Sequence, residues 1–187
     1  MPINDFELWN ACLKGDRKAQ KQLYERFAPK MFVVALRYCS GQQEAEDALQ
    51  EGFIKVFEYL GNFRQECPLE QWIKRIVINT ALKQNRSKLY LYPAFDVQDL
   101  EVAEEHLYQL DAYSLDELLQ MIQRLAPRYR VIFNLYAIEG YQHKEIAEML
   151  QISEGTSKSQ YSRAKAILQQ MIAQEEAKAA YESQQLR

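Results

Sequence analysis

The stretch YQHKEIAEMLQISEGTSKSQYSRAKAIL, residues 141–168, decides the fold of the C-terminal part of the chain. Its apolar spacing predicts two helices, at about 142–150 and 154–180, separated by the tight turn Gln151-Ile152-Ser153. The small side chain of Ala147 lets the two helices cross closely. This arrangement predicts a helix-turn-helix.

The turn and the second helix show how the two helices are held together. Ile152 fills the corner between them, and Ser153 is the expected N-cap of the second helix. The residues expected to face inward from that helix follow helical spacing and are Ser157, Tyr161, Ala164 and Leu168.

The opposite face of the second helix carries basic and hydroxyl side chains. Residues 156–168 contain three basic residues and no acidic one, and the predicted DNA contacts are Lys158, Ser159, Ser162 and Arg163. Such side chains near the start of a second helix suit the major groove of DNA. An ordinary helical hairpin with a solvated face is the alternative, but the turn, the cap and the charge together favour DNA recognition.

Composition places the rest of the chain in the same all-α class. The chain has 187 residues, 48% of them apolar, but only 6 glycines and 5 prolines, which is too few for a fold built on many tight turns. The net charge of −3 does not by itself indicate a nucleic-acid binder. Residues 88–113, however, hold six acidic residues and one lysine, so the acidity is concentrated in a middle segment.

The charge pattern and the helical periodicity divide the chain into two small domains and a linker. Residues 1–87 are expected to form a four-helix bundle, with helices from Asp5 to Gly15, after an Asp16 N-cap, and at about 43–60 and 69–86. Phe6, Trp9 and Leu13 carry the apolar pattern of the first helix, and the next one buries residues from Leu23 to Tyr38.

The segment 88–113 is expected to be a flexible acidic linker. Residues 114–187 form the second domain, in which Ser114 caps the first helix and Pro127 opens another that runs through Ile138 to Gly140.

The helix predicted at 69–86 has a second stripe outside its core face. Trp72, Arg75 and Asn79 follow one another at helical spacing, and Arg64 lies in the loop before the helix. Aromatic rings can stack on unpaired bases while cations contact phosphates, so the stripe is typical of a single-stranded nucleic-acid site. The alternative is that Trp72 belongs to the core, which is the commoner place for such a residue.

The helix predicted at 43–60 carries an acidic face. Glu44, Asp47, Glu51 and Glu58 share that face, and Lys55 is the single basic residue of the helix. It is either a solvated surface or a docking surface for a basic protein, where it would steer association.

An enzyme, a metalloprotein or a cofactor-binding protein is not expected. His106 and His143 are the two histidines and show no metal-ligand spacing, and no phosphate loop, nucleophile elbow or zinc motif is present. The three cysteines form no CxxC pair, and no apolar run reaches the roughly 20 residues that cross a bilayer. These features indicate a cytoplasmic protein with reduced thiols, no catalytic residues and no membrane contact of its own.

Residues of the first domain closely resemble the second conserved region of bacterial RNA polymerase sigma factors. They are AEDALQEGF at 45–53, Phe63-Arg64, Trp72-Ile73, Arg75-Ile76 and Asn79-Thr80-Ala81. The C-terminal domain resembles the fourth region through LAPRYRVIF at 125–133, Glu139-Gly140-Tyr141, Glu145-Ile146-Ala147 and GTSKSQ at 155–160. The absence of a large third region is similar to the extracytoplasmic-function (ECF) group of the sigma-70 superfamily.

The resemblance implies a subunit that binds core RNA polymerase and directs promoter-specific initiation. It assigns core binding to Asp47, Gln50 and Glu51, supported by Phe53, and assigns the melted non-template strand of the minus-ten element to Arg64, Trp72, Arg75 and Asn79. It assigns binding of the duplex minus-thirty-five element to Lys158, Ser159, Ser162 and Arg163. An anti-sigma factor is a further implied partner.

The sequence departs from the family pattern in two places. Residues 65–71 lack the small polar run that often precedes the tryptophan, and in the recognition helix Ser157 and Tyr161 replace the commoner Val and Leu. We therefore expect that helix to sit differently. The alternative function is a stand-alone helix-turn-helix regulator whose first domain is a sensor or dimerisation domain.

Overall fold

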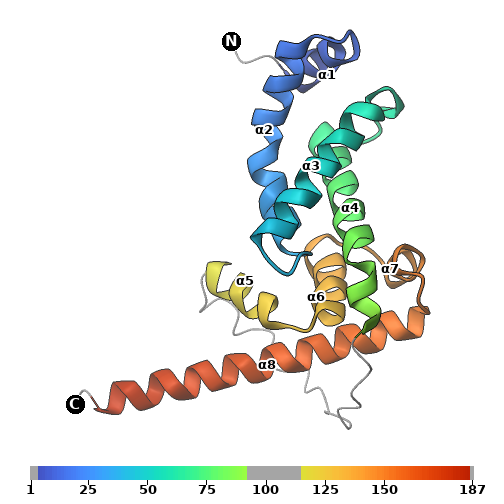
Figure 1. Ribbon diagram of the computed structural model, residues 1–187. Coiled ribbons are helices and arrows are strands. Elements are labelled where there is room, and N and C mark those ends of the chain that lie inside the picture. Colours follow the sequence, from blue (N-terminus) through green and yellow to red (C-terminus); the bar gives the residue numbers. More distant parts are fainter. Residues whose placement is uncertain (1–3, 92–114, 186–187) are drawn as a thin grey trace. The chain divides into compact units, whose positions relative to one another are not determined.

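Every regular element in the described residues, 4–91 and 115–185, is a helix, which confirms the all-α prediction (Figure 1). The computed structural model divides the chain after Lys88 into two compact units. Of the linker predicted at 88–113, residues 88–91 are helical, and residues 92–113, with His106, lie outside the described residues, as does the predicted Ser114 cap.

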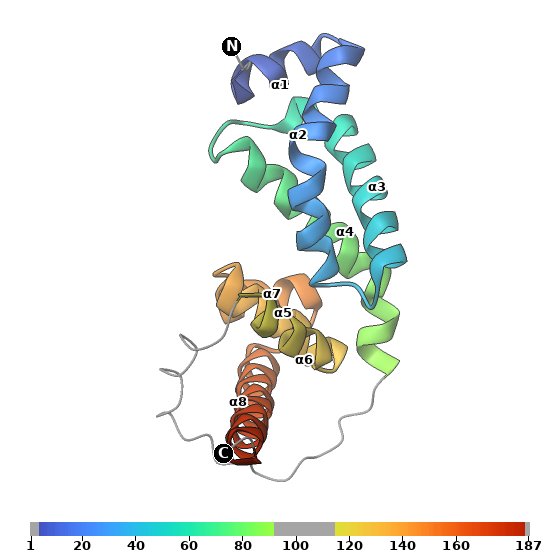
Figure 2. The same ribbon diagram turned by 90° about the vertical axis from the view of Figure 1, so that its left-hand side faces the viewer.

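Four α-helices and one 3₁₀ turn make up the first unit. They are α1 (Asp5–Leu13), α2 (Arg17–Leu36), α3 (Gln42–Glu58), η1 (Leu60–Asn62) and α4 (Leu69–Leu91). Helices α2 and α3 pack side by side (Figure 2). The helix predicted at 69–86 is longer than expected because no glycine or proline interrupts the chain before Pro93.

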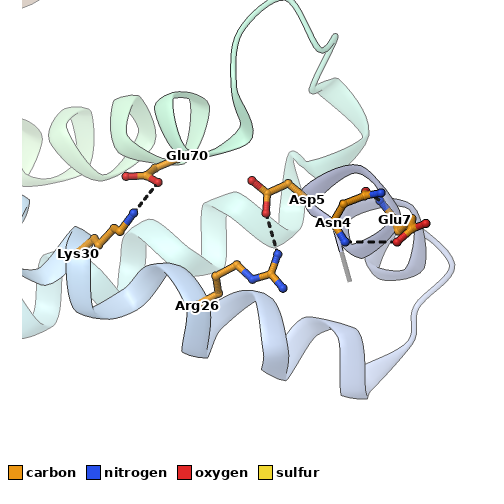
Figure 3. Close-up of polar contacts among 6 residues, drawn as sticks. All are labelled: Asn4, Asp5, Glu7, Arg26, Lys30 and Glu70. Carbon is orange, nitrogen blue, oxygen red and sulfur yellow. Dashed lines mark hydrogen bonds and ion pairs between the residues drawn. The ribbon is translucent and has the colours of Figure 1, made fainter. Parts of the chain in front are cut away.

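Short polar contacts fix where the first helices begin and how they meet (Figure 3). The Asp16 carboxylate accepts hydrogen bonds from the backbone N–H groups of Lys18 and Ala19, which confirms the predicted cap. Asn4 and Glu7 form a capping box at α1. An ion pair of 2.7 Å joins the carboxylate of Asp5, in α1, to the guanidinium of Arg26, in α2.

The predicted apolar face of α1 is wrong at two positions. Phe6 and Leu13 are exposed, whereas Leu8, Trp9 and Cys12 are buried. The indole N–H of Trp9 donates a 3.0 Å hydrogen bond to the carbonyl of Leu60. This bond fixes the rotation of α1 so that the face with Leu8 and Cys12 points into the bundle.

Helices α3 and α4 approach closely at Gly52. A Cβ atom placed on this glycine would lie 3.1 Å from Cγ2 of Val77 and 3.4 Å from its Cα. Gly52 and Val77 are both buried. The absence of a side chain at Gly52 therefore allows α3, with the predicted docking residues, to pack closely against α4, with the predicted strand-binding residues.

The second unit consists of α5 (Leu115–Arg124), α6 (Pro127–Phe133), the π-helical segment η3 (Asn134–Ile138), α7 (His143–Leu150) and α8 (Glu154–Gln185). Its core joins α5, α6 and α8 through Met121, Ile122, Leu125, Tyr129, Ala164, Leu168 and Ile172. The π segment differs from the single helix predicted through Ile138, because the Glu139 N–H reaches back to the Asn134 carbonyl over 3.0 Å.

The predicted turn between the last two helices is confirmed. Gln151 ends α7 in the left-handed conformation, with φ of 56°, and Ser153 caps α8 by accepting a 2.9 Å hydrogen bond from the Thr156 N–H. None of the described helices is both long enough and apolar enough to span a membrane.

Candidate functional site

The acidic face of α3 presents two of its predicted docking residues to solvent. Asp47 and Gln50 are exposed, and Ile54, one turn further along the same face, is 60% exposed. A single exposed apolar side chain is common on protein surfaces, so Ile54 does not by itself separate a docking surface from a solvated helix face.

Glu51 differs from its neighbours because its own chain holds both carboxylate oxygens. Oε1 pairs with the Lys55 ammonium at 2.5 Å, and Oε2 accepts a 2.7 Å hydrogen bond from the Gln84 amide of α4. Lys55 also lies 3.2 Å from the Thr80 hydroxyl of α4. The hydrogen bonds from Lys55 and then Gln84 lower the pKa of Glu51, so the carboxylate stays ionised at neutral pH.

Phe53 is 2% exposed and therefore supports the docking face from behind. Its ring meets Tyr24 of α2 edge-on, with 4.7 Å between the ring centroids. A partner protein cannot reach this side chain, so its place is in the packing of α3 against α2.

The predicted single-strand stripe lies along α4 and the loop before it. Arg75 and Asn79 are exposed on α4, Arg64 is exposed in the loop, and Trp72 is half-buried. The ring centroids of Trp72 and Phe63 are 5.4 Å apart. Phe63 also meets Trp9 edge-on, with 5.8 Å between the two centroids. Trp72 thus packs against a core ring while part of its side chain stays exposed, so its burial does not decide between a core residue and a base-stacking residue.

The outward face of α8 carries the predicted duplex contacts. Lys158 and Ser159 are exposed, and Ser162 and Arg163 are half-buried on the same side of the helix. Lys158 forms a 2.7 Å ion pair with Glu154, one turn earlier, and the hydrogen bond from Lys158 lowers the pKa of Glu154. The recognition face therefore begins with a neutralised pair followed by hydroxyl and guanidinium donors.

The inward face of α8 differs from an aliphatic helix-turn-helix. Ser157 is fully buried, and its hydroxyl lies 2.9 Å from Nδ1 of His143 in α7. His143 is the first residue of α7 and is half-buried, because its ring stacks on Tyr136. Burial lowers the pKa of His143, and the nearby Lys158 adds to this effect.

The predicted residues thus fall into three separate surfaces, two on the first unit and one on the second. Sequence reasoning missed the partners behind them: Lys55, Gln84 and His143. Lys55 could have been found from its spacing of four residues after Glu51, whereas contacts between helices leave no such local signal. No group of three or more metal-ligating side chains is found among the described residues.

Comparison with known proteins gives matches over both units. The family model of Sigma-70 region 2 matches residues 23–88, and that of Sigma-70 region 4 matches residues 115–168. The RNA polymerase sigma-H factor of Pseudomonas aeruginosa is 31% identical over 173 residues, which is 86% of this chain and 90% of that protein.

Two further relatives agree with these matches. The ECF RNA polymerase sigma factor SigM of Mycobacterium tuberculosis is 28% identical over 90% of this chain and 85% of its own length. The solved structure of the sigma factor RpoE from Bartonella quintana, in complex with the anti-sigma factor NepR, is similar with a TM-score of 0.52 and 24% identity, over 82% of this chain and 96% of that one.

Proposed function

Since this chain belongs to the extracytoplasmic-function group of the sigma-70 family, it directs promoter-specific transcription initiation by RNA polymerase, and we propose how its surfaces divide that work. The stand-alone regulator is set aside, because residues 23–88 match Sigma-70 region 2 rather than a sensor or dimerisation domain.

The first assignment is core-polymerase docking by the acidic face of α3. Asp47 and Gln50 contact a basic surface of the core enzyme, and Glu51 joins them from its fixed position between Lys55 and Gln84. Charge complementarity raises the rate of association, while the exposed apolar area of Ile54 adds affinity. Phe53 holds α3 in place by packing against Tyr24 and makes no contact with the core enzyme itself.

The second assignment is the melted minus-ten element. A flipped or unpaired base of the non-template strand stacks on the open part of Trp72, Arg64 and Arg75 contact phosphates, and Asn79 donates to a base edge. Because α4 and α3 belong to the same unit, this proposal assigns core docking and strand capture to one bundle.

The third assignment is the duplex minus-thirty-five element. Lys158, Ser159, Ser162 and Arg163 contact base edges and phosphates from α8, with the turn at 151–153 seating the helix in the major groove. The whole chain has a net charge of −3, so binding to DNA alone is expected to be weak and to need the contacts that core polymerase adds.

The remaining assignments follow from the family. The protein works in the cytoplasm, has no catalytic activity, metal or cofactor of its own, and is held inactive by an anti-sigma factor that covers the α3 face or the α8 face. Recovery of no inhibitor by pull-down under any growth condition would count against this last point.

One observation carries the proposal: regions 2 and 4 occur together on two compact units with separate charged and aromatic surfaces. The test is reconstitution with purified core polymerase on a library of random duplexes. We expect enrichment of a two-part sequence and permanganate reactivity of thymines in its downstream part. Trp72→Ala should lower this reactivity and the preference for the downstream part, and should leave the preference for the upstream part. Transcription without any sequence preference would contradict the proposal.

A further inference from the structure

Four side chains join the start of α7 to the buried side of α8, and we call them the His143 cluster: Tyr136, His143, Ser157 and Tyr161. Nδ1 of His143 lies 2.9 Å from the Ser157 hydroxyl oxygen. The imidazole stacks on Tyr136 with 4.2 Å between centroids and 12° between planes. Tyr136 also meets Tyr161, with centroids 4.5 Å apart, so the cluster closes on itself.

Ser157 needs the histidine because it is fully buried. The hydroxyl of Ser153 caps α8, so the hydroxyl of Ser157 is not needed to start the helix. A buried hydroxyl without a partner is costly, and in a helix-turn-helix an aliphatic side chain could fill the same volume at no such cost. The described contacts give this serine one side-chain partner, and it comes from α7.

The two members of the cluster that lie on α8 are each directly followed in the sequence by a proposed DNA contact. Ser157 precedes Lys158, and Tyr161 precedes Ser162, so each inward side chain is followed by an outward one about 100° further round the helix. A rotation or slide of α8 that disturbs the cluster must therefore move the DNA-facing side chains by a similar amount.

We propose that His143 is a positioning residue for promoter recognition: through its hydrogen bond to Ser157 it sets the rotation of α8 and hence where Lys158 and Ser162 meet the minus-thirty-five element. The inference rests on the proposed function of α8. It also explains the departure from the family pattern in the recognition helix, since Ser157 supplies a directional bond and Tyr161 supplies a ring against which Tyr136 packs.

Three substitutions separate the hydrogen bond from the packing. Ser157→Ala removes the hydroxyl with little change in volume. His143→Phe keeps a ring to stack on Tyr136 but removes Nδ1. His143→Asn loses the ring, yet its amide group lies close to the position of Nδ1 and can still bond to Ser157.

The experiment measures discrimination by the reassembled holoenzyme. The probes are a promoter duplex selected from a random library by the native holoenzyme and the same duplex with its upstream element scrambled. The ratio of the two dissociation constants reports recognition by α8 alone. Leu168→Ala, in the core of the second unit and outside the cluster, is the control for general loss of stability.

We expect His143→Phe and Ser157→Ala each to lower the ratio roughly tenfold, and the double variant to lower it no further, since both remove one hydrogen bond. His143→Asn and Leu168→Ala should keep the native ratio. Native discrimination in His143→Phe and Ser157→Ala, or an equal loss in Leu168→Ala, would overturn the inference. If the native holoenzyme shows no discrimination at all, the proposed role of α8 fails and the inference fails with it.

Discussion

The α3 face of the first unit and the α8 face of the second are both fixed by polar contacts to a neighbouring helix, but in different ways. On α3 the fixed group is Glu51 itself, a half-buried carboxylate that belongs to the proposed docking surface. On α8 the fixed group is Ser157, which is fully buried behind the proposed DNA surface.

The difference separates contact from positioning. A substitution at Glu51 changes both the charge offered to a partner and the bond between α3 and α4, so its effects cannot be divided. A substitution at Ser157 leaves every exposed side chain of α8 chemically unchanged and alters only how the helix is held. The second unit is therefore where the value of positioning alone can be measured.

The largest effect is expected from Gly52→Leu, which would force α3 away from α4. The Cβ atom of the new side chain would lie 3.1 Å from Cγ2 of Val77, and the rest of the leucine has no space beyond it. Overpacking of this kind lowers the free energy of unfolding by about 2–3 kcal/mol. Both tryptophans, Trp9 and Trp72, lie in the first unit, so the loss should appear as a lower midpoint of unfolding followed by tryptophan fluorescence.

Gly52→Ala is the matched control for that change. The added methyl group is tight against Val77, but alanine favours a helix over glycine by about 1 kcal/mol, so the two effects should nearly cancel. Equal stability of Gly52→Leu and the native chain would show that α3 and α4 do not depend on their close approach.

Trp72→Ala is expected to come next. Stacking of a base on an aromatic ring contributes about 1–3 kcal/mol, so binding of a single-stranded non-template oligonucleotide by the holoenzyme should weaken correspondingly. Trp72→Phe keeps a ring beside Phe63 and should retain most of the affinity. If the alanine variant binds the oligonucleotide as tightly as the native chain, Trp72 is a core residue and no more.

The two units should lose stability in different pH ranges. The pKa of His143 is lowered from 6.5 by burial, so the folded state binds this proton less readily than the unfolded state, and the second unit should weaken as pH falls below 6.5. The pKa of Glu51 is lowered from 4.5 by Lys55 and Gln84, so its contribution is present above pH 4.5 and lost below it.

Hydrogen exchange resolved by segment is the measurement for this comparison. Between pH 7.5 and 5.5, roughly the window in which an ordinary histidine titrates, the protection factors, which correct for the slower intrinsic exchange at lower pH, should fall in α7 and α8 but not in α3 and α4. His143→Phe should abolish the change. A uniform response of both units would mean that neither group controls its own unit.

The smallest effect is expected from Glu154→Ala, which releases Lys158 from its ion pair. The ammonium becomes available to phosphate, so binding of the holoenzyme to non-specific duplex should strengthen slightly and depend more steeply on salt. Glu148→Ala removes an exposed acid of α7 and serves as the charge-matched control. Identical salt slopes in the two variants would show that the pair does not restrain Lys158.

Local chemistry made much of the fold predictable. The Asp16 and Ser153 caps, the turn after α7 and the acidic face of α3 all follow from neighbours in the sequence, and the structure contains each of them. The residues of each proposed surface could be grouped for the same reason, because side chains at helical spacing share a face whatever lies behind them.

The features that the sequence did not predict depend on contacts between residues that are far apart in the chain. The rotation of α1 depends on a hydrogen bond from Trp9 to Leu60, 51 residues away, and the bond from Gln84 to Glu51 spans 33 residues. The π segment at 134–138 has no local signal in its residues, since only the backbone bond from Glu139 back to Asn134 distinguishes it from an α-helix. Burial of His143 likewise needed Tyr136 and Ser157 to be brought together by the turn.

Co-elution with purified core RNA polymerase tests the central claim most directly, with the native chain compared against Asp47→Lys and, as a charge-matched control on α2, Glu25→Lys. Asp47 is exposed, so its reversal changes the docking surface without disturbing the bond between α3 and α4. We predict tight binding by the native chain and by Glu25→Lys, and loss of binding by Asp47→Lys. Equal binding by all three, or none by a folded native chain, would contradict the assignment of α3 as the docking surface.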